Sequence, residues 1–260
     1  MSGVLRSIVK FAIAACLLIA GSTTALSAET LAELPPEERV KWPSVGVVTS
    51  RGRDGTVECS GILVAPDLVI TAAHCTTNET GLMDGLRFIA GLNGSRRVAT
   101  SSAVEIMRHP AWGFASGKQR LQYDLAVLRL GRLIPSDKVQ PAKLLPGRLP
   151  LPQRGVLLGY QKSAGRSLHG QLNCALMRRR PAGVVTSNCQ VTDGNSGGAV
   201  MVQTEGAWWL AAVIAARQDP GGKAIAIAVN TWLRGLVSDA MVREEQRVQS
   251  ALGIDHVGEE

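Results

Sequence analysis

Short apolar runs separated by turn residues recur along most of the chain, and they set the expected secondary structure. In the first half these runs lie at Val45–Val48, Gly61–Val64, Leu68–Thr71, Arg87–Ile89 and Val104–Met107, and Leu125–Leu130 follows them. In the second half they lie at Val156–Tyr160, Ala199–Val202, Trp209–Ala215 and Ala224–Val229. Many short strands with turn signals between them are typical of an all-β barrel or sandwich. We therefore predict an all-β core that begins near Val45.

A proline-rich stretch divides this strand pattern into two halves of similar character. Residues 132–151 contain four prolines, and clustered prolines mark loops because proline lacks a backbone N–H and interrupts regular structure. We therefore predict two β domains, over residues 45–135 and 136–229, that are connected through this stretch.

The last part of the chain changes from a strand-like to a helical pattern. Its apolar residues recur at three- and four-residue steps, at Leu233, Leu236, Val237, Ala240, Met241, Val248 and Leu252. This spacing predicts an amphipathic helix, for which Asn230 is a suitable N-cap and Gly253 a suitable stop. We expect residues 230–260 to form a terminal helix and tail, with the helix packed on a barrel.

The first 28 residues have the layout of a secretory signal peptide. Arg6 and Lys10 precede the apolar run Phe11–Ala20, and small residues follow it. The run is shorter than the roughly 20 residues that a membrane-spanning helix needs. We therefore expect a secreted or periplasmic protein with no stable membrane anchor. Residues 13–16 loosely resemble a lipoprotein processing box around Cys16, but the apolar run continues past that cysteine.

Residues 29–44 lie between the signal peptide and the predicted core. They are rich in charge and contain the pair Pro35 and Pro36, a composition typical of loops. We expect them to form an exposed N-terminal arm that is not part of the core.

The charge balance is only mildly basic once the signal peptide is set aside. Removing it takes Arg6 and Lys10 from the 28 basic residues and none of the 21 acidic ones, which leaves a net charge of +5. The basic residues are scattered apart from Arg178–Arg180, which we interpret as a solvated loop. We therefore expect no nucleic-acid partner.

Four cysteines remain outside the signal peptide, and an oxidising compartment favours disulfides between them. Four cysteines allow three pairings, of which the two local ones, Cys59–Cys75 and Cys174–Cys189, are favoured because the two pairs lie far apart in the sequence. A zinc site is the alternative, but the spacings typical of zinc ligands do not occur. We expect no metal and no organic cofactor.

Three short motifs carry the candidate chemistry. They are Thr71–Cys75 around His74, Tyr123–Leu130 around Asp124, and Asp193–Gly198 around Ser196. A serine hydroxyl is a weak nucleophile at neutral pH, so it needs a histidine to take its proton and a carboxylate to fix the tautomer of that histidine. In this order and with these flanking residues, the motifs closely resemble those of the chymotrypsin-like (trypsin-like) serine protease family. A glycine-bounded serine also occurs in α/β-hydrolases, but there the order is serine, acid, histidine.

The resemblance implies two six-stranded antiparallel β-barrels of the chymotrypsin-like fold with a C-terminal α-helix. It makes His74 the general base, Asp124 the orienting carboxylate and Ser196 the nucleophile. Gly194 lets the backbone turn so that its own N–H and that of Ser196 point to one spot, where they would stabilise the oxyanion of a tetrahedral intermediate.

One residue of the nucleophile turn departs from the commonest family pattern. Asn195 stands where animal digestive members carry an aspartate that pairs with a freshly cut N-terminus, and no start of the Ile-Val-Gly-Gly type precedes Val45. We hypothesise that activation does not use a cleavage-generated ion pair and that hydrogen bonds of Asn195 hold the oxyanion hole. In this respect the sequence resembles bacterial secreted members of the family.

Four residues align with the specificity pocket of the family. Gln190 falls at the pocket floor in place of the aspartate that selects Lys or Arg, so trypsin-like specificity is not expected. Ala215, Ala216 and Arg217 fall on the pocket wall, where Arg217 either favours acidic substrates or obstructs the pocket.

These observations predict a secreted, monomeric serine endopeptidase that acts on polypeptides through an acyl-enzyme. A different class remains open, a catalytically weak or inactive binding or signalling protein on the same fold, because a fold does not by itself define activity. Esterase activity, which uses the same chemistry, is the third alternative.

Overall fold

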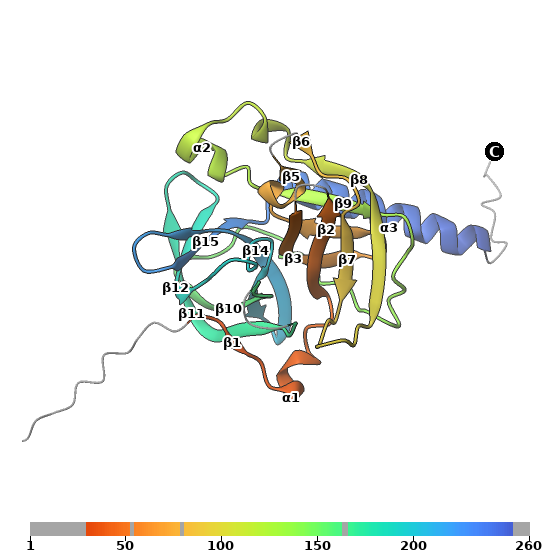
Figure 1. The fold of residues 1–260 in the computed structure, drawn as a ribbon, viewed down its shortest axis with the longest axis horizontal. Coiled ribbons are helices and arrows are strands. Elements are labelled where there is room, and N and C mark those ends of the chain that lie inside the picture. The colour runs from red at the N-terminus through yellow and green to blue at the C-terminus, as the bar shows by residue number, and fades with distance from the viewer. Residues whose placement is uncertain (1–29, 53–54, 79–80, 163–165, 252–260) are drawn as a thin grey trace, which may run out of the picture.

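The computed structural model describes residues 30–52, 55–78, 81–162 and 166–251 as two β-barrels that lie side by side, with one long helix behind them (Figure 1). The N-terminal barrel is closed by six antiparallel strands in the order β2-β3-β4-β9-β8-β7. These strands are β2 (Val45–Gly52), β3 (Gly55–Ala65), β4 (Leu68–Thr71), β9 (Ala126–Leu130), β8 (Ala99–Arg108) and β7 (Arg87–Ala90).

The C-terminal barrel also has six antiparallel strands, because β12 pairs with both β15 and β11 and so closes the sheet. Its strands are β10 (Gln153–Gly159), β11 (His169–Arg179), β12 (Val184–Gln190), β13 (Ala199–Thr204), β14 (Ala207–Gln218) and β15 (Lys223–Ala228). A further short strand, β1 (Ala32–Glu33), pairs with β11 from outside the ring. The fold expected from the motifs is confirmed.

Most buried apolar side chains of the described residues belong to three clusters, one for each barrel and a larger one that contains residues from both. Alternating strand residues supply the first two clusters, since successive side chains point to opposite faces of a sheet. Leu63, Phe88 and Leu128 belong to the N-terminal cluster, and Leu157, Val200 and Ile214 belong to the C-terminal one. The third cluster includes Ile62, Leu158 and Leu233, so it joins the two barrels to the C-terminal helix.

The C-terminal helix α3 (Thr231–Ala251) begins where the sequence predicts. The Asn230 side chain accepts a hydrogen bond from the Leu233 N–H at 3.0 Å and so caps the first turn. Leu233, Val237 and Ala240 are buried against the barrels. Met241 and other apolar residues further along are exposed, so only the first half of the helix packs as an amphipathic element. Gly253 lies outside the described residues.

The N-terminal arm is largely exposed, but the expectation that it is not part of the core is wrong. Leu31, Leu34 and Trp42 are 2%, 5% and 4% exposed, respectively. These three apolar residues pack into the core, while the charged residues and prolines between them face water. Because the apolar residues are isolated in the sequence, they form no recognisable apolar run. β1 and the short helix α1 (Pro36–Arg39) lie within this segment. The predicted signal peptide, residues 1–28 with Cys16, lies outside the described residues.

The described connections contain five short elements, none of which is part of a barrel. They are η1 (Ala73–Thr76), β5 (Thr77–Asn78), β6 (Gly81–Leu82), η2 (Pro110–Trp112) and α2 (Gly117–Leu121), and β5 pairs with β6. Residues 132–151 run between the barrels without a strand of their own, as their prolines predict. Within the described ranges, no helix is both long and apolar enough to span a bilayer.

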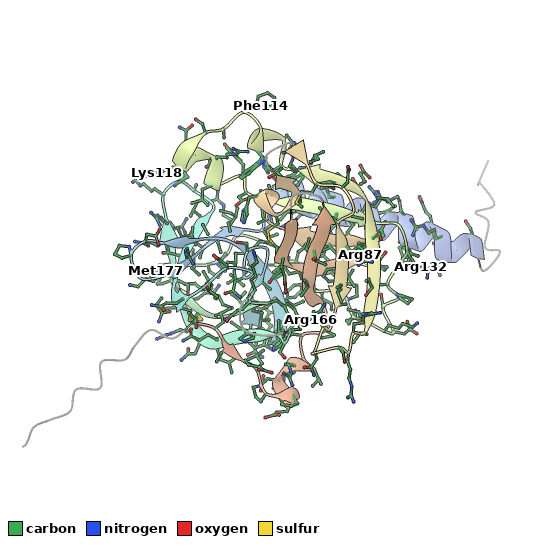
Figure 2. All side chains as sticks on the ribbon, in the orientation of Figure 1. Arg87, Phe114, Lys118, Arg132, Arg166 and Met177 are labelled. Carbon is green, nitrogen blue, oxygen red and sulfur yellow. A yellow bond between two sulfur atoms is a disulfide. The ribbon has the colours of Figure 1, made fainter. Side chains whose placement is uncertain are left out.

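Basic side chains are spread over the surface. Figure 2 shows Arg87 and Arg132 on the side of the N-terminal barrel, Lys118 at α2 above the other barrel, and Arg166 near the lower edge between them. This distribution agrees with the scattered positive charge of the sequence.

Candidate active site

His74 lies in η1, the short helical turn that directly follows β4. The neighbouring Cys75 forms a disulfide with Cys59 of β3, as the local pairing predicts. Cys174 and Cys189 form the second disulfide, between β11 and β12. The first bridge ties the histidine turn to a strand of the same barrel, which restricts the position of the imidazole.

Asp124 lies at the end of the loop that precedes β9, and it holds His74 at two points. One carboxylate oxygen accepts a hydrogen bond from the His74 backbone N–H at 2.9 Å, and the other lies 2.7 Å from His74 Nδ1. The Asp124 side chain is 5% exposed, whereas that of His74 is 39% exposed. Because Nδ1 donates to a carboxylate, the neutral imidazole carries its free lone pair on Nε2, on the ring edge away from Asp124.

Ser196 lies on a tight turn between β12 and β13. Gly194 and Gly197 on either side have φ angles of +97° and +80°, a region that favours glycine. A Cβ atom on Gly197 would lie 2.1 Å from the Ser60 carbonyl oxygen, so the turn also packs too closely for a side chain there.

The Cys59–Cys75 bridge lies between the serine turn and the histidine. Cys75 Sγ is 3.7 Å from His74 Nε2 and 3.8 Å from the Ser196 carbonyl oxygen. Among the described residues, the Ser196 hydroxyl and His74 Nε2 do not form a hydrogen bond with each other. Catalytic hydrogen bonds are often long in an enzyme without substrate and shorten when substrate binds.

From Gly194 to Gly198, the backbone N–H groups of Gly194 and Ser196 have no acceptor among the described residues. The other three N–H groups of this stretch are paired: that of Asn195 donates to Thr192 O, that of Gly197 to Ile214 O and that of Gly198 to Asn195 O. A pair of unpartnered donors on one glycine-bounded turn is the arrangement that stabilises a developing oxyanion.

Asn195 is fully buried, and its side chain joins this turn to neighbouring backbone groups through two hydrogen bonds. Its Nδ2 donates to the Tyr160 carbonyl oxygen at 2.8 Å, and its Oδ1 accepts from the Thr192 N–H at 2.9 Å. The side chain is therefore satisfied by neutral partners, with no cation among its hydrogen-bond partners. These are hydrogen bonds of the kind that the sequence hypothesis requires.

The residues aligned with the specificity pocket lie on β12 and β14, the two strands that pair with opposite edges of β15. Gln190 ends β12 and pairs with Lys223 of β15. Ala215, Ala216 and Arg217 follow one another in β14. Ala215 is buried, whereas the Arg217 side chain is half exposed and lies 3.3 Å from Asp193, the residue before Gly194.

Sequence reasoning did not find Ser60, Tyr160 or Lys162, all of which contact the serine turn. The Lys162 N–H donates to the Asp193 carbonyl oxygen at 3.0 Å. The Tyr160 hydroxyl donates to the Leu92 carbonyl oxygen at 3.0 Å, and burial raises the pKa of this phenol. No local motif marks these residues, because each contact joins segments that are far apart in the sequence.

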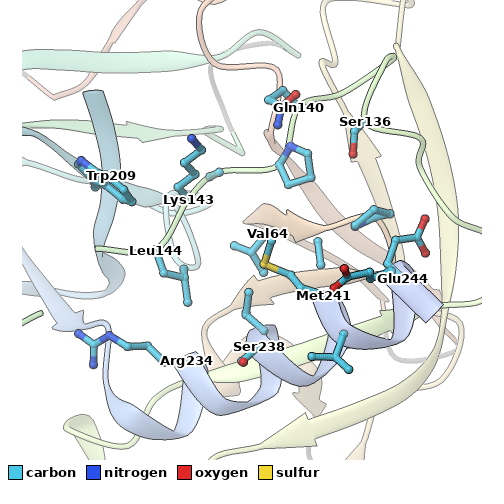
Figure 3. Close-up of a pocket in the computed structure, with 17 residues that line it drawn as sticks. Val64, Ser136, Gln140, Lys143, Leu144, Trp209, Arg234, Ser238, Met241 and Glu244 are labelled. Atoms are coloured by element: carbon cyan, nitrogen blue, oxygen red, sulfur yellow. The ribbon is translucent and has the colours of Figure 1, made fainter. Parts of the chain in front are cut away.

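Cys59, His74 and Cys75 form a compact group of residue types that bind metals elsewhere. Both sulfur atoms belong to one disulfide, and the metal ligand is a thiolate, so this group does not form a metal site. A groove with a volume of about 610 Å³ lies elsewhere, between α3 and residues 136–144 (Figure 3). None of the three motif residues lines it.

Two antiparallel barrels, with a histidine and an aspartate on the first and a glycine-bounded serine turn on the second, define the class of chymotrypsin-like proteins. Solved structures agree with this fold. A Glu endopeptidase in complex with MPD matches with a TM-score of 0.67 and 17% identity, over 82% of this chain and 97% of that one. The thermostable serine protease AL20 from an extremophilic microorganism matches with a TM-score of 0.61 and 19% identity, over 72% and 92%.

Sequence comparisons identify the family. The family model described as Trypsin matches residues 35–233. Chymotrypsin-like elastase family member 1 of Rattus norvegicus is 30% identical over 195 residues, which cover 69% of this chain and 68% of the relative. Proproteinase E of Bos taurus is 36% identical over 91 residues, which cover only 34% and 35%. The chain belongs to the trypsin family of serine endopeptidases.

Proposed function

We propose that this protein is a secreted serine endopeptidase that hydrolyses peptide bonds on a triad of Ser196, His74 and Asp124. The observation that carries the proposal is the two-point contact between Asp124 and His74, which places the free Nε2 on the edge of the ring away from Asp124. The disulfide at Cys75 contacts both this nitrogen and the serine turn. The trypsin family supports a polypeptide as the substrate.

The proposed reaction begins when the Ser196 hydroxyl attacks the scissile carbonyl carbon and its proton passes to His74 Nε2. Asp124 holds the ring in the productive tautomer and stabilises the imidazolium that forms. The N–H groups of Gly194 and Ser196 donate to the oxyanion. The leaving amine takes the proton from His74, which completes the acyl-enzyme, and water then hydrolyses the ester by the same steps in reverse.

Secretion is supported by the N-terminal pattern of residues 1–28 and by the two disulfides, which persist in oxidising compartments. Activation without a cleavage-generated ion pair is supported by Asn195, whose amide is satisfied by Tyr160 and Thr192. We propose that this neutral pair of hydrogen bonds takes the place of the buried ion pair of the digestive members.

A fluorophosphonate probe tests the proposal directly, because it labels only an activated serine. We expect the secreted protein to be labelled, Ser196→Ala to remain unlabelled, and Ser101→Ala, which changes a buried serine away from the site, to be labelled like the wild type. A peptide library then identifies the bonds that are cleaved. Absence of labelling in the folded wild type would contradict the proposed chemistry, and labelling without peptide cleavage would favour a binding or esterase role.

A further inference from the structure

Ser60, in β3 of the N-terminal barrel, is fully buried and contacts the serine turn of the other barrel. Its hydroxyl donates to the Gly194 carbonyl oxygen at 2.8 Å and accepts from the Tyr160 N–H at 2.8 Å. Its backbone N–H donates to the Ser196 carbonyl oxygen, also at 2.8 Å. One residue of the first barrel therefore binds the carbonyl oxygens of Gly194 and Ser196, the two residues whose N–H groups form the proposed oxyanion hole.

We propose that Ser60 is a positioning residue that fixes the oxyanion hole from across the junction of the barrels. This inference rests on the proposed function. Ser60 touches neither the scissile bond nor the proton-transfer groups, so its effect acts through the backbone of the turn.

The geometry of a peptide unit explains how such an effect arises. Each peptide unit is planar, so a hydrogen bond to its carbonyl oxygen also fixes the direction of its N–H. The bonds from Ser60 fix the peptide units that follow Gly194 and Ser196. The unit between them, which carries the Ser196 N–H, is left with little rotation. The Gly194 N–H belongs to the preceding unit, and the bond from Lys162 to the Asp193 carbonyl oxygen fixes that one.

The hydroxyl of Ser60 adds hydrogen bonds between the two barrels that its backbone does not make. Its donor and acceptor functions are both used, and both of its side-chain partners are backbone groups of the C-terminal barrel. Without the hydroxyl, the Gly194 carbonyl oxygen and the Tyr160 N–H would be left without these hydrogen bonds, and a buried unpaired group favours rearrangement. Gly194, at a φ of +97°, has no side chain to restrict its rotation.

Labelling kinetics with the fluorophosphonate probe test the proposal. During labelling the Ser196 Oγ–P bond forms, the P–F bond breaks, fluoride leaves and the hydroxyl proton passes to His74. The phosphoryl oxygen takes the place of the oxyanion. With the probe in excess, the rate constant does not depend on how much of a variant folds.

We expect Ser60→Ala to lower the maximal labelling rate about 10- to 100-fold with little change in the half-saturating probe concentration. Outright loss of one oxyanion donor costs about 10²- to 10³-fold, and misalignment costs less. With a cleavable peptide from the library, we expect the same loss in kcat and an unchanged KM.

Ser101→Ala is the matched control. Ser101 is a buried serine in β8 of the same barrel, and its hydroxyl also donates to a carbonyl oxygen and accepts from an N–H, both of Arg132. Ser60→Thr keeps the hydroxyl, so we expect it to label faster than Ser60→Ala even where it lowers the melting temperature as much.

The outcomes separate this inference from the proposed function. If the wild type reacts and Ser60→Ala reacts as fast as Ser101→Ala, Ser60 does not position the oxyanion hole, although the protease proposal stands. Equal rates for Ser60→Thr and Ser60→Ala at equal melting temperature would also overturn it, since packing alone would then explain the loss. An unreactive wild type would overturn the proposed function itself.

Discussion

Asp124 restricts His74 more than a single hydrogen bond would, because its two oxygens bind two different atoms of the same residue. The backbone contact fixes where the residue lies, and the ring contact fixes the orientation of the imidazole, with Nδ1 toward Asp124. A charged acceptor also makes these hydrogen bonds stronger than neutral ones. The sequence predicts the identities of His74, Asp124 and Ser196 because each lies in a short motif.

Residue identity alone does not predict the supporting contacts. Ser60 lies 134 positions from Gly194 and 100 from Tyr160, and no periodicity or spacing connects them. These contacts exist only because two barrels pack edge to edge. In a site assembled from two domains, sequence motifs therefore predict the reactive groups but not the residues that align them.

His109 gives a prediction for the pH dependence of stability. Its Nδ1 accepts from the Ala111 N–H at 3.2 Å, and its ring lies 4.9 Å from that of Tyr123 and 5.1 Å from that of Trp232. Burial lowers the pKa of His109 below 6.5 in the folded state. The unfolded chain therefore binds a proton more readily, so the stabilising contribution is present above the unfolded pKa and is lost as pH falls through the folded pKa.

We expect His109→Asn to reduce this pH dependence, because an asparagine keeps an acceptor for the Ala111 N–H but does not titrate. Urea unfolding at pH 7 and pH 5 measures the effect. The wild type should lose more unfolding free energy than the variant between these two pH values. An equal loss in both proteins would contradict the role assigned to His109.

Secondary structure is predictable wherever a strand is apolar throughout or a helix has a marked cap. β4, whose four residues are all buried, and the start of α3 at Asn230 are examples. The sequence pattern does not predict β11 and β12, because buried residues in these strands are interspersed with exposed polar ones and form no continuous apolar run. The buried residues of the arm are not predicted for a related reason, since each is isolated among charged residues and prolines.

The buried arm makes a prediction about the stability of an element. Leu31 is 2% exposed and packs in the cluster of the C-terminal barrel, whereas Val40 in the same arm is 74% exposed. We expect Leu31→Ala to lower the free energy of unfolding by about 2–5 kcal/mol, the usual cost of truncating a buried leucine. Val40→Ala is the matched control and should change it by less than about 0.5 kcal/mol. Denaturant unfolding compares the two variants, and similar small losses would show that the arm does not stabilise the barrel.

At the scale of the whole molecule, the site depends on alignment between the two barrels. The N-terminal barrel carries His74, Asp124 and Ser60, and the C-terminal barrel carries the serine turn. The shared apolar cluster with Ile62, Leu158 and Leu233 holds these two halves in register. Any change that lets one barrel shift against the other would therefore displace His74 relative to the serine turn.

The N-terminal arm also contacts a segment that supports the serine turn. The Leu31 carbonyl oxygen accepts a hydrogen bond from the buried Gln161 side chain at 2.7 Å. Gln161 precedes Lys162, whose N–H fixes the peptide unit that carries the Gly194 N–H. The arm thus contacts the serine turn through one intervening segment, and it does so without a charged N-terminus.

Removal of residues 30–41 should therefore lower activity. In a family member activated by cleavage, trimming to a new N-terminus raises activity by orders of magnitude. Here we expect the fluorophosphonate labelling rate to fall by about tenfold or more, because the oxyanion donors lose part of their alignment. Val40→Ala, which changes the arm without removing a buried contact, should label at the wild-type rate. A large rise in labelling after trimming would show that the arm inhibits the enzyme and that Asn195 does not replace the activating ion pair.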